Sequence, residues 1–130
     1  MEDVIDSFPI QQFAEELLNA RENLKVGTAI WFENYMIRVW DLRLEPGERL
    51  PFHCHQNTYF WVCEQGGRGI DRQPKGKIRT HDYSIGEVTW HDLTPQQPLI
   101  HDLENVGDSI LRFQAVELLK LPANWKNPEG

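Results

Sequence analysis

Apolar residues near the start of the chain recur at the spacing of one face of a helix. Ile10, Phe13 and Leu17 lie three or four positions apart. This period is typical of an amphipathic helix, and it predicts one over about residues 9–23. Pro9 suits the first turn of that helix, because the N–H that proline lacks would have no helical partner there.

From about residue 26 to residue 118 the pattern changes to short apolar runs rich in Trp, Tyr, Phe, Val and Ile. Turn-forming residues interrupt these runs, among them Gly47, Gly66 and Gly86. Many short strands with frequent turn signals indicate an all-β sandwich or barrel. The tail, residues 119–130, is rich in proline and asparagine and is expected to be irregular.

The segment 36–44 shows the alternation of a half-buried strand. Trp40 and Leu42 share one face, which is predicted to point into the core. Ile37 and Val39 lie on the opposite face and make it partly apolar as well. That second face is therefore expected to contact either a helix or another subunit.

Length and charge narrow the classes of partner. At 130 residues the chain is predicted to form a single domain over residues 1–130. It carries 13 Lys and Arg against 20 Asp and Glu, a formal net charge of −7, and it has no basic run. Binding to nucleic acid or to an anionic membrane depends on clustered Lys and Arg. Neither is expected to be a partner.

The chain also lacks the sequence features of membrane and secreted proteins. No apolar stretch approaches the roughly 18 residues of a membrane span. The first residues are acidic where a signal peptide would be basic, so we expect a cytoplasmic protein. Cys54 and Cys63 are too few for a disulfide framework, and both are expected to be reduced thiols.

Three histidines form a candidate metal site. His53 and His55 are two residues apart in a predicted strand, which places both imidazoles on one face with their Cα atoms about 6.5 to 7 Å apart. Two neighbouring ligands do not hold a metal ion selectively, so a third must come from a distant strand, and His101 can supply it. Taken alone, a His-x-His pair lies on the surface or in a hydrogen-bonded core at least as often as it binds a metal ion.

The surroundings of this pair resemble the first sequence motif of the cupin superfamily. That motif reads glycine, five residues, His-x-His, three or four residues, glutamate, six residues and glycine. Here Gly47 precedes the histidines and Gly66 follows them at the matching spacings. Tyr59 takes the place of the glutamate, and it is the one element that departs from the motif.

A second stretch resembles the ends of the second cupin motif. Gly86 opens a predicted strand, and His101 is separated by three residues from Asn105. The interval between Gly86 and His101 is longer than usual, and Pro98 stands where the motif commonly has its second glycine. These departures affect the expected shape of the loop before His101 more than the assignment of His101 as a ligand.

Together the two motifs span about residues 26–118, and the chain is similar to the small single-domain "cupin 2 conserved barrel" proteins, including those labelled β-alanine degradation proteins. The resemblance implies an RmlC-like jelly roll, or double-stranded β-helix, with an N-terminal α-helix before it. It also implies that His53, His55 and His101 bind one divalent ion of iron, zinc, manganese or nickel. Because cupins of this size often pair through an outer sheet, we expect a homodimer through the partly apolar face of segment 36–44.

Four further residues are predicted to lie beside the metal ion or to line a substrate pocket: Tyr59, Trp61, Trp90 and His91. Tyr59 is expected to stay a neutral phenol beside the ion, because its ordinary pKa lies near 10. The two tryptophans can equally be core residues. His91 is a less favoured candidate for a base beside the ion, since a solvent or core histidine is the commoner case. Arg38 shares its face with Trp40, which would aim it inward to bind a substrate carboxylate; the alternative, and the more common state of an arginine, is exposure at the end of the strand.

Two functions of different classes remain open from the sequence. The first is a mononuclear metal-dependent enzyme that acts on a small polar organic molecule, for example as a dioxygenase. The second is a non-catalytic cupin that binds or senses a small ligand. Retention of all three histidines favours the enzyme, because a barrel that only binds has no chemical need for them.

Overall fold

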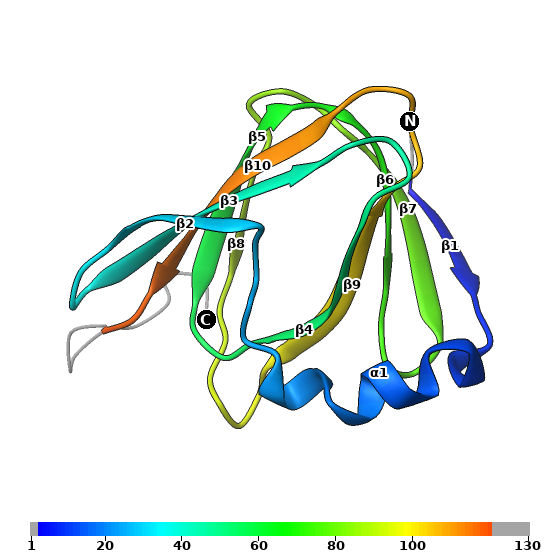
Figure 1. Ribbon diagram of the computed structural model, residues 1–130, viewed down its shortest axis with the longest axis horizontal. Helices are drawn as coiled ribbons and strands as arrows, with labels where there is room; N and C mark the ends of the chain where they lie inside the picture. The colour runs from blue at the N-terminus through cyan, green and yellow to red at the C-terminus, as the bar shows by residue number, and fades with distance from the viewer. Residues whose placement is uncertain (1–2, 121–130) are drawn as a thin grey trace.

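Two antiparallel sheets of five strands each lie face to face in the computed structural model, which describes residues 3–120 (Figure 1). One sheet has the strand order β1-β7-β6-β9-β4 and the other β2-β3-β10-β5-β8. The predicted all-β jelly roll is confirmed. The strands are β1 (Val4–Ser7), β2 (Ala29–Glu33), β3 (Ile37–Leu44), β4 (Arg49–His55), β5 (Tyr59–Gln65), β6 (Gly67–Arg72), β7 (Lys77–Tyr83), β8 (Val88–His91), β9 (Leu99–Asn105) and β10 (Leu111–Leu118).

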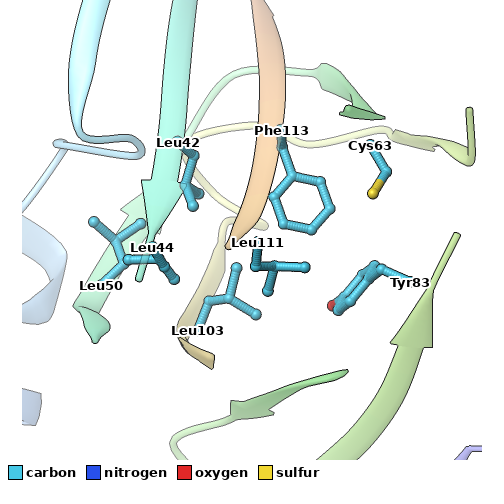
Figure 2. Packing of buried hydrophobic residues seen from close by; sticks show 8 residues of the cluster. All are labelled: Leu42, Leu44, Leu50, Cys63, Tyr83, Leu103, Leu111 and Phe113. Atoms are coloured by element: carbon cyan, nitrogen blue, oxygen red, sulfur yellow. The ribbon is translucent and has the colours of Figure 1, made fainter. Parts of the chain in front are cut away.

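The apolar core fills the space between the sheets at one end of the molecule. Leu42 and Phe113 come from one sheet, and Leu50 and Leu103 come from the other. Figure 2 shows how these side chains meet those of Leu44, Cys63, Tyr83 and Leu111. Strand β3 contributes Trp40, Leu42 and Leu44 to the interior, as its alternation predicted.

Two motif glycines are required by the turns that they form. Gly86 has a φ of +84°, a left-handed conformation that residues with a side chain rarely adopt. Gly66 lies against strand β7, where an added Cβ atom would be only 2.4 Å from the carbonyl oxygen of Tyr83. Both glycines therefore serve the close joining of strands at the ends of the barrel.

The predicted N-terminal helix is broken into three short pieces. A 3-10 turn (Ile10–Phe13), the α-helix α1 (Ala14–Leu18) and a second 3-10 turn (Ala20–Glu22) follow one another. Asn19 ends α1 because its side chain donates a hydrogen bond to the carbonyl of Glu15 (3.1 Å) in a non-helical conformation. The prediction of one continuous helix over residues 9–23 is wrong, since the apolar residues do not form one buried stripe.

Charged side chains tie this segment to the strands that carry the histidines. Glu16 of α1 accepts hydrogen bonds from the Arg49 guanidinium (2.7 and 3.0 Å). Arg49 also donates to Asp102 (2.7 Å), which is fully buried and accepts two further bonds from Arg72. Because Asp102 follows His101 directly, this network fixes β9 against β4 from the outer side of the sheet.

The end of the barrel, the helices and the cysteines agree with the sequence in the following respects. Strand β10 ends at Leu118, where the barrel was predicted to end, and residues 121–130 of the expected tail lie outside the described residues. Within residues 3–120 no helix is long and apolar enough to cross a membrane. Cys54 and Cys63 are both buried and unpaired, as expected.

Candidate metal centre

The three predicted histidines converge on one point in the interior. His53 and His55 lie on β4 with one residue between them, so their side chains leave the same face of the strand. β9 pairs with β4 in a register that places His101 opposite His53. The Nε2 atom of His55 lies 3.0 Å from that of His53 and 3.2 Å from that of His101.

Burial keeps these imidazoles neutral. It lowers the pKa of His53 to about 4, and it lowers the pKa values of His55 and His101 well below the ordinary value. A metal ion binds the neutral form of histidine, so the three lone pairs are available at neutral pH. Charge repulsion from the neighbouring histidines also lowers the pKa values of His55 and His101, so protonation of the cluster is unfavourable.

The geometry fits a divalent metal ion. Two nitrogen ligands about 2.1 Å from an ion are about 3.0 Å apart at a right angle and about 3.4 Å apart at the tetrahedral angle. The distance of 3.0 Å between His53 and His55 matches the right angle, and the distance of 3.2 Å between His55 and His101 lies between the two values. His53 Nδ1 donates to the carbonyl oxygen of Pro51 (2.7 Å), which leaves its Nε2 free for an ion. His55 Nδ1 is buried with no hydrogen-bond partner among the described residues.

The histidines form part of the wall of a cavity of about 240 Å³ between the sheets. Tyr59, Trp61 and His91 also line it. Cys54, which lies between His53 and His55 in sequence, neither lines the cavity nor belongs to the histidine cluster, as the alternation of the strand predicted.

Comparison with known proteins supports the fold. Neither a protein-family model nor a curated protein matches the sequence. Among solved structures, a cupin domain from Bordetella pertussis is 21% identical, with a TM-score of 0.61 over 69% of this chain and 88% of that chain. A double-stranded β-helix protein from Klebsiella pneumoniae is 15% identical, with a TM-score of 0.57 over 85% of this chain and 87% of that one.

An RmlC-like cupin from Methanocaldococcus jannaschii is 14% identical, with a TM-score of 0.52 over 72% of this chain and 91% of that chain. The three proteins share the double-stranded β-helix with this chain. The chain has the cupin fold. At these identities the likeness concerns the fold alone.

Tyr59, the residue in place of the motif glutamate, lies between two imidazoles. Its ring stacks on that of His55 with 4.0 Å between centroids and an angle of 6°. His91 covers the other side at 4.8 Å. Burial raises the pKa of Tyr59 above its ordinary value, so its hydroxyl stays protonated. Tyr59 therefore fixes the orientation of His55 by contact.

The two tryptophans of the predicted pocket lie on different faces. Trp61 of β5 lines the cavity and packs edge-on against Tyr83 and Phe113. Trp90 does not line it, and the prediction that it would is wrong. Because it is adjacent to His91 in β8, it lies on the outer face, where it stacks on Phe60 and is 43% exposed.

Arg38 also lies away from the cavity lining. Its guanidinium donates to Glu33 and Glu117, at 2.5 and 3.5 Å, and these acidic side chains hold it at the end of β3. The idea that Arg38 binds a substrate carboxylate is therefore not supported.

Sequence reasoning missed a second polar group in the cavity. Asp71 of β6 and Arg79 of β7 lie opposite each other in register and form an ion pair, and the Tyr83 hydroxyl accepts a further bond from Arg79. All three line the cavity. Burial raises the pKa of Asp71, and the nearby guanidinium of Arg79 opposes that rise. The sequence carried no signal for this carboxylate, because alternation in this segment would have turned Ile70 inward, whereas the structure buries Gly69 and Asp71.

Proposed function

We propose that this protein is a mononuclear metal-dependent cupin enzyme that acts on a small polar organic molecule. The observation that supports it is the convergence of three neutral imidazoles on the wall of a cavity of about 240 Å³. His53, His55 and His101 would hold the ion through their Nε2 atoms. A bound divalent ion of iron, zinc, manganese or nickel would supply Lewis acidity or, if iron, electron transfer.

The side chains around the cluster have separate parts in this proposal. Tyr59 holds the imidazole plane of His55, and Pro51 holds the tautomer of His53 through its carbonyl oxygen. Trp61 and the core residues exclude water from one end of the cavity. Asp71 and His91, which are ionisable and line the same cavity, are able to exchange a proton with a bound molecule.

Metal analysis of histidine variants tests the proposal. Protein purified without a histidine tag and reconstituted with Fe²⁺, Zn²⁺, Mn²⁺ or Ni²⁺ should bind close to one ion per chain. His53→Ala, His55→Ala or His101→Ala should each lower bound metal at least tenfold, because two imidazoles hold an ion weakly. His91→Ala is the matched control, since His91 lies in the cavity outside the cluster and should leave metal content unchanged.

Equal metal content in the wild type and in a variant that lacks all three histidines would contradict the proposal. Retained metal binding without turnover of any small molecule would instead favour the second function, a cupin that binds or senses a ligand. Circular dichroism of every variant should show the same strand content, because the main apolar cluster lies apart from the histidines.

A further inference from the structure

Asp71 has one carboxylate oxygen that no described residue satisfies. Its side chain is 8% exposed and lines the cavity. Both Nε and Nη2 of Arg79 donate to Oδ2, at 3.0 and 2.9 Å. Within residues 3–120 no side-chain or backbone group donates a hydrogen bond to Oδ1. Oδ1 is not among the buried polar atoms that lack a partner, so it is reachable from the cavity and can accept a hydrogen bond from a ligand there.

Four of the five guanidinium N–H groups of the arginine beside it are engaged, and the fifth is on Nη1, the atom that donates to Asp3. Besides its two bonds to Asp71, Arg79 donates to Asp3 at 3.3 Å and to the Tyr83 hydroxyl at 3.4 Å. The Asp71–Arg79 pair is thus arranged as an acceptor with a neutralising cation behind it. It selects a hydroxyl or an ammonium group, and it disfavours a second carboxylate at this end.

The histidine end of the cavity has the opposite preference. The charged residues of the lining, Lys77, Arg79, Asp71 and Glu87, sum to zero. The three imidazoles are neutral, and Tyr59 supplies no charge where the motif has a carboxylate. A divalent ion would therefore leave two positive charges uncompensated inside the barrel, and an anionic group on the ligand would offset part of that charge.

Cavity size limits the ligand. A volume of about 240 Å³ is smaller than the roughly 300 to 1,000 Å³ of sites for drug-sized ligands. The two ends therefore have to be bridged by a short molecule.

We propose that the cavity binds a short organic acid whose carboxylate lies at the histidine-bound metal ion and whose hydroxyl or ammonium group donates a hydrogen bond to Oδ1 of Asp71. This proposal rests on the metal-dependent function proposed above. It names the class of substrate and makes Asp71 the residue that selects within that class.

Binding of small acids to the Co²⁺-loaded protein tests it without an assay of turnover. The probes are propionate, its 2- and 3-hydroxy derivatives, its 2- and 3-amino derivatives, and propionamide. Calorimetry and the visible spectrum of Co²⁺ report binding and contact with the ion. We expect at least one hydroxy or amino acid to bind at least tenfold more tightly than propionate, and propionate more tightly than propionamide. The better of the two classes identifies the donor as a hydroxyl or an ammonium.

Asp71→Asn provides the specific control. It should remove most of the tenfold preference for the hydroxy or amino acid while changing the affinity for propionate less than twofold. If the variant does not fold, the wild type still decides through its spectra: the tighter-binding derivative should give the same Co²⁺ spectrum as propionate, because a hydroxyl or amino group that chelated the ion instead of bonding Asp71 would change that spectrum. Equal binding of propionate and all its derivatives, or of the acid and the amide, would overturn the inference and leave the metal site standing. Failure of Co²⁺ to bind would overturn both proposals.

Discussion

Contact with neighbouring rings determines what Tyr59 does in this protein. The residue is 2% exposed, and its ring lies between the imidazoles of His55 and His91. A phenol becomes a strong metal ligand when it loses its proton, and burial makes that loss harder by raising the pKa of Tyr59. The contribution of Tyr59 is therefore the stacking surface.

Replacing the hydroxyl and replacing the ring should have different effects. Tyr59→Phe keeps the ring and should retain metal content within about twofold of the wild type. Tyr59→Ala removes a buried ring and should lower the free energy of unfolding by about 3 to 5 kcal/mol. Elemental analysis and denaturant unfolding measure the two effects. A metal-free Tyr59→Phe protein that has also lost a charge-transfer band would show that Tyr59 is a direct ligand.

At the scale of elements, strand β1 pairs with β7 along the backbone, and the charged residue that precedes β1 adds bonds to side chains of β7. Val4 and Ile5 are 58% and 54% exposed, so apolar burial stabilises the strand little. Asp3 bonds His81 Nδ1 at 2.5 Å and Arg79 at 3.3 Å, and Glu87 bonds His81 Nε2 at 2.8 Å. The attachment of this edge strand therefore depends in part on the charge of His81.

The attachment of β1 should weaken as pH rises. Burial opposes protonation of His81, but its bonds to Asp3 and Glu87 outweigh burial and raise its pKa above 6.5. Because the folded pKa is raised, the stabilisation is complete below pH 6.5 and is lost as pH rises through the raised value. Arg79 keeps its charge throughout, and the neighbouring Tyr83 stays neutral because burial raises its pKa.

Hydrogen exchange of the β1 and β7 amides measures this dependence. Between pH 6 and pH 8, after correction for intrinsic rates, exchange should rise two- to fivefold, or about 0.5 to 1 kcal/mol, as for partly exposed ion pairs. Asp3→Asn should abolish the dependence, whereas Asp6→Asn, on the same strand, should preserve it. Exchange that does not change with pH in the wild type would rule out this role of His81.

At the scale of the whole molecule, the outer face of the second sheet carries an apolar row across all its strands. Phe32 pairs with Val39, Val39 with Val116, Val116 with Phe60, and Phe60 with Trp90. Phe32 and Trp90, at the two ends, are 53% and 43% exposed. The face that Val39 was expected to make apolar is thus wider than the single strand suggested.

We propose that this row is the interface of a homodimer. A standard interface of roughly 800 Å² per partner would cover it. Light scattering at micromolar concentration should give twice the 15.3 kDa chain mass. Phe32→Glu and Trp90→Glu should give monomers, because each would bury an unpaired charge. Leu18→Glu, on an exposed leucine elsewhere, is the control that should remain dimeric. A wild-type monomer would refute the proposal.

Local periodicity in the sequence predicted the strand-rich region that begins near residue 26 and placed two of the three histidines, but it did not predict β1. The alternation along β3 identified its buried face, and the single residue between His53 and His55 placed both on one face. The same rule also contradicts one prediction, because adjacent Trp90 and His91 cannot both face the cavity from one strand. Errors of this kind concern the face of the strand on which a side chain lies. The alternation of side chains determines that face once the bounds of the strand are known.

What the sequence by itself determined is therefore the all-β class, the spacing of the turns and the identity of the residues with metal-binding chemistry. Only the tertiary structure decided which distant residues meet. The register of β9 on β4 brings His101 to His53, and that of β6 on β7 brings Asp71 to Arg79. The physical reason is that strand pairing joins residues far apart in the chain, and the free energy that selects the register comes from packing and charge pairing across the whole barrel.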